Sequence, residues 1–161
     1  MIADRSWQAE EVSERDIPYE PVAAVIRSRR TSMFVDPTRE VPVDVVAELC
    51  ELATWAPCHK KTWPWQFALF TGDGRARLGA TMVADMVDAE FGDETKREKT
   101  TRKYLRTPAT LVVGCAPHPN EMLHLENRDS TAAAIQNLLL GATALGLATF
   151  WSTPALTRPP A

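Results

Sequence analysis

Residues 42–71, PVDVVAELCELATWAPCHKKTWPWQFALFT, carry the pattern that decides the predicted fold. Apolar side chains recur at i, i+3, i+4 and i+7 after Pro42, which predicts a helix that Pro57 ends. They are Val46, Leu49, Cys50 and Ala53. An aromatic and cationic loop occupies residues 57–64, and the run Gln66–Thr71, closed by Gly72-Asp73-Gly74, predicts a strand and a turn.

An amphipathic segment precedes this unit. Pro21 opens it, and Val22, Val25 and Ile26 share one face at helical spacing, so we expect a short helix that ends near Arg30. Residues 1–20 are mostly polar and are interpreted as an N-terminal extension. At 161 residues, the chain has the length of one domain, which we assign to residues 21–161.

Helices and strands alternate in the rest of the chain. A third helix is predicted by Leu78, Met82, Val83 and Met86, which line one face. A buried strand is expected at Ala109–Ala116, followed by a helix capped by Asp129 or Ser130 and ended by Gly146. Leu147–Trp151 reads as a final strand. This order favours an α+β or three-layer arrangement.

Composition and charge exclude several classes of protein. The formal net charge of −3 argues against nucleic-acid binding by bulk positive charge. Three cysteines are too few for a disulfide framework and suggest a reducing compartment, the cytoplasm by default. Residues 1–20 lack the apolar core of a signal peptide. The uncharged stretch 130–157 is interrupted by polar residues, glycines and a proline, so we expect no membrane span.

Four short motifs stand out in chain order. They are Arg29-Arg30-Thr31-Ser32, Ala56-Pro57-Cys58-His59-Lys60-Lys61, Trp63-Pro64-Trp65 and Trp151-Ser152-Thr153. Together with Gln136-Asn137-Leu138 and Gly146-Leu147, they resemble the FMN-dependent nitroreductase family, and the Ala-Pro-x-His-Lys form is most similar to its short-chain bacterial NAD(P)H nitroreductases. The resemblance implies a three-layer α/β/α sandwich with a central, mainly antiparallel sheet.

The resemblance also implies which residues bind cofactors. Arg29, Arg30 and Thr31 match the phosphate segment, and guanidinium and hydroxyl donors suit the dianionic phosphate of FMN. A competing interpretation is that the two arginines only complement the dipole of the first helix. His59 is implied at the edge of the flavin ring, although a structural hydrogen bond is the alternative for a loop histidine.

Two further stretches are implied at the site. The resemblance places Trp151, Ser152 and Thr153 against FMN. It places a nicotinamide-binding stretch at Gly141, Ala142, Thr143, Ala144, Leu145 and Gly146. Helix packing explains Gly141 and Gly146 equally well. Trp63 and Trp65 are candidates for the pocket wall, with core packing as the alternative.

Other chemistry is less favoured by the residues. Cys58 beside His59 suggests a thiol nucleophile, but adjacent side chains in an extended loop point apart and no orienting acid is evident. Four residues at 118–126 suggest a metal site, but they lack the signature of one, and we expect no metal. These are His118, Glu121, His124 and Glu126. The basic cluster at Lys96–Arg106 is interpreted as a solvated face rather than a nucleotide-phosphate site.

The resemblance implies an NAD(P)H oxidoreductase that reduces nitroaromatic or quinone-like acceptors through FMN in a ping-pong scheme. The protein would supply orientation and charge, with no catalytic side chain. The family binds FMN at the interface of a homodimer; no nucleic-acid or membrane partner is expected. Met33 and Trp55 depart from cationic positions of the family pattern, and the chain is read as lacking the usual C-terminal strand and arm. The alternative is therefore a truncated, non-catalytic flavin-binding or scaffold relative.

Overall fold

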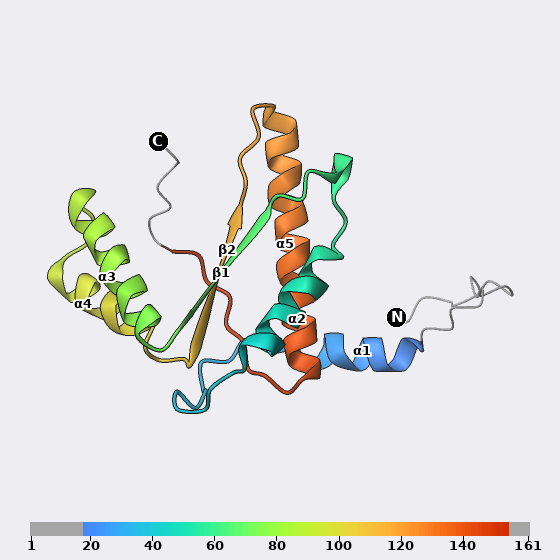
Figure 1. Cartoon of the computed structure of the whole chain (residues 1–161), viewed down its shortest axis with the longest axis horizontal. Helices are drawn as coiled ribbons and strands as arrows, with labels where there is room; N and C mark the ends of the chain where they lie inside the picture. The colour runs from blue at the N-terminus through green and yellow to red at the C-terminus, as the bar shows by residue number, and fades with distance from the viewer. Residues whose placement is uncertain (1–17, 155–161) are drawn as a thin grey trace, which may run out of the picture.

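The computed structural model describes residues 18–154, and Figure 1 shows how their helices and strands are arranged. Most of the predicted extension 1–20 and the end of the predicted domain, 155–161, lie outside the described residues. The described elements are α1 (Tyr19–Ser28), α2 (Val43–Thr54), the short 3-10 helix η1 (His59–Lys61), β1 (Trp65–Thr71), α3 (Asp73–Asp88), α4 (Glu94–Lys103), β2 (Ala109–Cys115) and α5 (Glu121–Ala144). No helix within 18–154 combines the length and apolar character that a membrane crossing needs.

The two strands pair antiparallel along their whole length. The register runs from Trp65 opposite Cys115 to Thr71 opposite Ala109. Helices α3 and α4 lie to one side of the strands in Figure 1, and α2 and α5 lie to the other. This combination of helices with an antiparallel sheet confirms the predicted α+β class and its layered arrangement.

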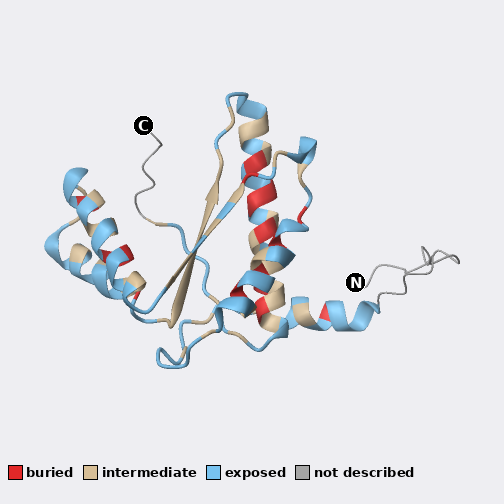
Figure 2. Cartoon of the chain, viewed as in Figure 1, coloured by how far each residue is buried: buried red, intermediate tan, exposed pale blue. Residues whose placement is uncertain are grey.

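The core lies where α2 packs on α5. Ala53 of α2 and Ala134 of α5 are fully buried, with Trp65 and Phe67 of β1 packed against them (Figure 2). Small side chains at this contact let the two helix axes approach closely. The predicted helix between Pro42 and Pro57 is thereby confirmed, with Val46 and Leu49 on its buried face.

Helix α5 corrects the prediction for its start. The expected caps, Asp129 and Ser130, lie inside the helix, which begins at Glu121, and the Asn120 side chain accepts a hydrogen bond from the backbone N–H of Leu123. Ser130 is buried, so its polarity does not mark a solvent-exposed helix end. The segment around Pro119 is therefore the N-terminal boundary of a 24-residue helix.

Two segments contain helix that the sequence pattern did not assign. The Gly72-Asp73-Gly74 turn is the start of α3, with Gly72 as the N-cap residue at a φ of 47°. The charged segment after α3 contains α4, whose N-cap Asp93 accepts a hydrogen bond from the Lys96 backbone N–H. This helix has no buried residue of its own and is held by packing along α3.

The predicted final strand at Leu147–Trp151 is wrong. Within the described residues, this segment makes one parallel bridge, Thr149 with Thr31, and the Ser32 N–H donates to the Thr149 carbonyl at 2.9 Å. A strand needs a partner over several residues, and the chain around Thr31 offers one position only.

The predicted apolar face of α1 is not buried within one chain. Ala23 is the buried residue of this helix, whereas Val22 and Ile26 are about half exposed. The expected buried strand at Ala109–Ala116 is half-buried along β2. In Figure 2, α1 is mostly exposed and β2 is intermediate, so apolar side chains of both elements are only partly covered within this chain.

Candidate functional site

The first candidate group lies where α1 ends. Arg29, Arg30 and Thr31 follow its last residue, Ser28, and the bridge from Thr31 to Thr149 brings this segment beside the chain that leads to residues 151–153. Thr31, Trp151, Ser152 and Thr153 are all exposed. The structure therefore brings together two of the predicted motifs that are about 120 residues apart in the sequence.

The two arginines of this group differ in their surroundings. The Arg30 guanidinium donates to the carbonyl oxygens of Arg27 and Arg29, the latter at 2.9 Å, so it caps the carboxyl end of α1. Such a contact at the carboxyl end of the helix is what the alternative interpretation expects, in which the arginines complement the dipole of α1. The Arg29 side chain has no hydrogen-bond or ion-pair partner within residues 18–154. Arg29 is therefore the freer guanidinium for an anionic ligand.

The stretch 141–146 ends α5 close to the same region. A side chain at Gly141 would meet Leu49 and Leu52 of α2 at 2.9 and 3.1 Å, so glycine here permits close helix packing. Gly146 has a φ of 73°, and the Leu147 N–H closes back onto the Ala142 carbonyl, as in a glycine helix cap. Helix packing thus accounts for Gly141 and the helix cap for Gly146, and Ala142 is buried. The nicotinamide assignment of this stretch stays a prediction.

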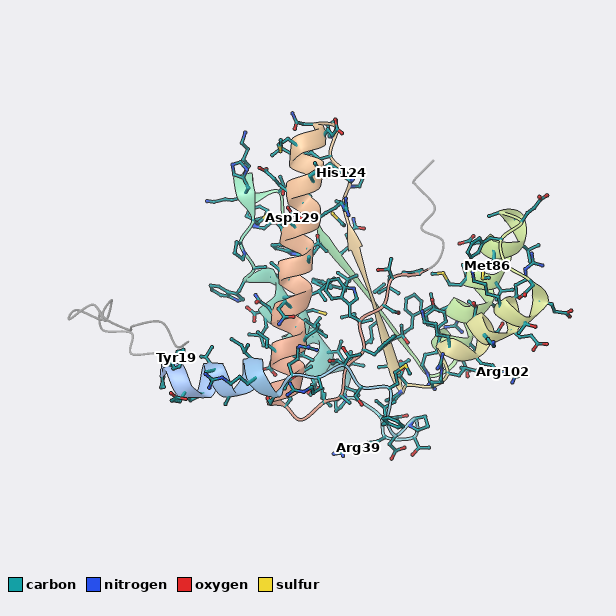
Figure 3. All side chains as sticks on the ribbon, turned by 180° about the vertical axis from the view of Figure 1, so that it is seen from behind. Tyr19, Arg39, Met86, Arg102, His124 and Asp129 are labelled. Atoms are coloured by element: carbon teal, nitrogen blue, oxygen red, sulfur yellow. The ribbon has the colours of Figure 1, made fainter. Side chains whose placement is uncertain are left out.

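The second candidate group lies at the other half of α5. His59 begins η1, and its Nδ1 lies 2.7 Å from Oε2 of Glu126. The pair borders an open hollow of about 330 Å³ whose remaining lining residues are Pro57, Asp129, Ser130 and Ala133. Figure 3 labels Asp129 on α5 beside η1. The hollow presents carboxylates, a hydroxyl and an imidazole at one surface.

Cys58 has a structural environment rather than that of a nucleophile. Its sulfur accepts a hydrogen bond from the Trp63 N–H at 3.3 Å and lies 3.4 Å from the Thr62 hydroxyl. His59, the nearest candidate base in the chain, pairs with Glu126 instead. Within residues 18–154, the hydrogen-bond contacts of Cys58 therefore include no base for the thiol-enzyme alternative.

The sequence pattern considered Glu126 only as a member of a disfavoured metal group and did not identify Asn127. Both residues contact the loop from positions 65 to 67 residues away, and no local pattern marks these contacts. Among the described residues, no group of three or more histidine, cysteine, aspartate and glutamate side chains is placed to hold a metal ion. Burial raises the pKa of the Cys50 thiol and of the Tyr104 phenol, but neither belongs to these two groups.

The two candidate groups do not meet within one chain. Glu126 and Gly141 are fifteen residues apart on α5, which places them about 22 Å apart at the rise of an α-helix. In Figure 1, η1 lies beside the N-terminal half of α5, and the end of α1 lies near its C-terminal end. The described part of the chain therefore carries two separate candidate groups.

Comparisons with known proteins give one family. The model of the nitroreductase family matches residues 26–158. The Bacillus subtilis protein named "Putative NAD(P)H nitroreductase YfhC" is 31% identical over 137 residues, which cover 80% of this chain and 67% of YfhC. The Escherichia coli (strain K12) protein named "Putative NAD(P)H nitroreductase YdjA" is 28% identical to this chain over 106 residues, which cover 65% of this chain and 57% of YdjA.

Solved structures agree with this fold. A nitroreductase-like family protein from Bacillus cereus superposes with a TM-score of 0.73 at 29% identity, covering 90% of this chain and 73% of that one. The FMN-dependent nitroreductase NfnB from Mycobacterium smegmatis, solved in complex with NADPH, gives a TM-score of 0.63 at 22% identity, covering 80% and 73%. The second likeness concerns the fold alone.

Proposed function

The chain belongs to the nitroreductase family, and on that premise we propose that it is an FMN-dependent oxidoreductase that passes hydride from NAD(P)H to nitroaromatic or quinone-like acceptors in a ping-pong sequence. The name of YfhC and the NADPH complex of NfnB support the donor, and the FMN dependence of NfnB supports the cofactor. The observation that carries the proposal is the bridge between Thr31 and Thr149, which joins the segment after α1 to residues 151–153.

The residues after α1 fit the phosphate of FMN. The Arg29 guanidinium is unpaired within 18–154, no carboxylate of that range pairs with Arg30, and the Thr31 hydroxyl is exposed. A phosphate dianion prefers the planar, two-pronged donors of arginine together with a hydroxyl. Ser152 and Thr153, three and four residues beyond the bridge residue Thr149, add two exposed residues with hydroxyls. We assign these residues to binding the phosphate and ribityl end.

FMN, when bound, supplies the two-electron chemistry that lets a hydride donor and an oxidant react in turn at one pocket. The chain's own contribution is to orient this group and to place charge and hydrogen bonds around it. We assign His59 to the ring edge, where an imidazole nitrogen can donate or accept a hydrogen bond. No side chain is assigned a covalent or acid–base role, and Cys58 is left with its structural hydrogen bonds.

We propose a homodimer in which each FMN meets the first candidate group of one chain and the second candidate group of the other. Glu126, which contacts His59, and Gly141, toward the end of α5 near which α1 ends, are about 22 Å apart along α5, so the imidazole of one chain would complete the site of the other. The exposed apolar side chains also support a covered interface. They include Met33, Phe34, Trp55, Trp63 and Trp151, and Phe34 is 96% exposed. A two-fold dimer would contain two equivalent sites.

The free state of the thiols supports a reducing compartment, and we propose the cytoplasm. Cys50, Cys58 and Cys115 form no disulfide within the described residues.

Anaerobic reduction tests the activity. The purified chain is loaded with FMN, separated from excess flavin, and mixed with NADH or NADPH under nitrogen. We expect a yellow protein whose flavin absorbance bleaches and returns when a nitroaromatic or a quinone is added. Bound flavin that does not bleach with either nucleotide would instead support the non-catalytic relative. Failure to bind FMN at all would refute the assignment of the phosphate segment.

Mixed dimers test the shared site. Subunits with His59→Ala are combined with subunits carrying Arg29→Ala and Arg30→Ala, after each variant alone has been shown to bind FMN weakly. In a shared arrangement, one site of each mixed dimer contains no substitution, so about half of the mixed-dimer sites regain FMN binding. If both groups of a site come from the same chain, every site stays defective and binding does not return.

A further inference from the structure

The contact between His59 and Glu126 sets the chemistry of the imidazole. An ionised carboxylate accepts hydrogen bonds and cannot donate one. The 2.7 Å contact between Nδ1 and Oε2 therefore requires the proton on Nδ1. The other ring nitrogen, Nε2, is left to meet a ligand. Because His59 is 57% exposed in its side chain, this second nitrogen is accessible from solvent in the single subunit.

The loop that carries His59 has a strained backbone. Lys60, Lys61 and Trp63 have φ angles of 54°, 53° and 41°, in the left-handed region that side chains other than glycine rarely adopt. Such residues persist when surrounding contacts determine their conformation, and they are concentrated at functional sites. The surrounding contacts of this loop therefore decide where the imidazole lies.

The neighbouring residue of α5 supplies the main contact. Asn127 is 3% exposed, and its Oδ1 accepts a hydrogen bond from the Thr62 hydroxyl at 2.6 Å. Its Nδ2 donates to the carbonyl of Ala116 at 3.4 Å, and the Ala116 N–H donates to the Pro64 carbonyl at 2.7 Å. One buried amide thus joins the loop, α5 and the end of β2.

We propose that Glu126 and Asn127 are positioning residues for His59. Glu126 fixes the orientation of the His59 ring and the tautomer in which Nδ1 of this ring carries the proton. Asn127 holds the strained loop that carries the ring. Second-layer partners of this kind orient a histidine in many sites where its other nitrogen binds a ligand. The inference rests on the proposed function in one respect only, the assignment of His59 to the flavin ring.

Nitrogen chemical shifts of the imidazole test the action of Glu126 without any flavin. In the full chain labelled with ¹⁵N-histidine, His59 is assigned by comparison with His59→Ala. We expect the neutral ring to carry its proton on Nδ1 in the wild type and to shift toward the Nε2–H form in Glu126→Ala. Glu126→Gln should fall between the two, because its amide can either accept from Nδ1–H or donate to an unprotonated Nδ1. A tautomer that does not change in Glu126→Ala overturns the proposal.

A charge-matched control separates the contact from the local charge. Asp129→Ala removes one carboxylate from the wall of the same hollow without touching the imidazole, so the His59 tautomer should stay as in the wild type. If Asp129→Ala shifts the tautomer as much as Glu126→Ala, the effect comes from the field of the hollow and the proposed role of Glu126 is wrong.

Flavin affinity tests whether Glu126 acts through His59. We expect Glu126→Ala to weaken FMN binding about tenfold, the effect of one hydrogen bond to a charged group. The same substitution should have no further effect in a His59→Ala background, whereas independent effects would add. Additive losses overturn the proposal. If His59→Ala itself leaves FMN binding unchanged, the assignment of His59 to flavin fails, and the tautomer experiment still decides the action of Glu126 on the ring.

The loop contact is tested through Thr62, because Asn127 is buried and its replacement could prevent folding. Thr62→Ser keeps the hydroxyl and should retain the His59 signals and the FMN affinity of the wild type. Thr62→Val removes the hydroxyl and should shift the His59 signals and weaken FMN binding. Equal behaviour of the two variants would show that the contact with Asn127 does not position the loop.

Discussion

Replacing Thr62 by valine removes its hydrogen bond to Asn127 and its 3.4 Å contact with the Cys58 sulfur, with almost no change in volume. The lost hydroxyl leaves Oδ1 of Asn127, 3% exposed, without its 2.6 Å donor. A buried acceptor left without a partner costs about 1 to 3 kcal/mol of folding free energy. Since valine has nearly the same shape as threonine, no cavity adds to this cost. Thr62→Val should therefore be destabilised by about that amount.

Urea unfolding followed by tryptophan fluorescence measures the effect. For a slope of about 2 kcal/mol per molar urea, the midpoint should fall by about 0.5 to 1.5 M with the slope unchanged. Thr54→Val is the control, because its hydroxyl donates to the Glu51 carbonyl at 2.7 Å on an exposed surface. The control should stay within about 0.5 kcal/mol of the wild type. A midpoint for Thr62→Val equal to that of Thr54→Val would refute the buried-acceptor reasoning.

The remaining predictions concern packing, ionisation and the thiol. Gly79→Ala should be destabilised by about 1 to 2 kcal/mol in thermal unfolding, because its new methyl group would lie 2.9 Å from the Thr101 carbonyl oxygen. Gly74→Ala is the control and should not lose stability, because no neighbouring atom lies closer than 3.8 Å to its new methyl group. A larger loss in Gly74→Ala than in Gly79→Ala would contradict the packing. Burial raises the pKa of Tyr104. The phenolate absorbance that the wild type shows and Tyr104→Phe lacks should therefore develop above a pH of about 10, and a normal titration would be the contrary result. The stability contributed by burying the protonated phenol should decline as the pH rises past that value. Cys58→Ser should retain flavin reduction by NAD(P)H, since the serine oxygen can accept the same backbone hydrogen bond, and loss of turnover with flavin still bound would revive the thiol mechanism.

The sequence predicts α2 and β1 well because independent signals agree there. Apolar spacing and two prolines define the helix, and the strand begins directly after a fully buried Pro64. Helix α4 is harder to predict, because it has no apolar face of its own and depends on α3 for packing. The start of α5 is misplaced because Asp129 and Ser130 have cap-forming side chains in the middle of a helix.

In the candidate site, too, some residues can be predicted from local sequence and others depend on how the chain packs. Arg29, Arg30, Thr31 and residues 151–153 can be found through the family pattern, and the Thr31–Thr149 bridge places the two stretches together. Glu126 and Asn127 act across more than 60 residues of sequence, so their contacts depend on how α5 packs beside the loop. The separation of the two candidate groups likewise depends on the length of the folded helix α5, so no sequence motif predicts it.

The central claim is that the guanidiniums after α1 bind the phosphate of FMN, and equilibrium titration of the flavin with wild type and Arg29→Ala/Arg30→Ala tests it most directly. The double variant should bind FMN at least about tenfold more weakly, because each lost charged hydrogen bond contributes about 1.5 to 3 kcal/mol. It should bind riboflavin, which has no phosphate, as the wild type does, and Arg77→Ala should leave FMN affinity unchanged. Full FMN affinity in the double variant would contradict the claim.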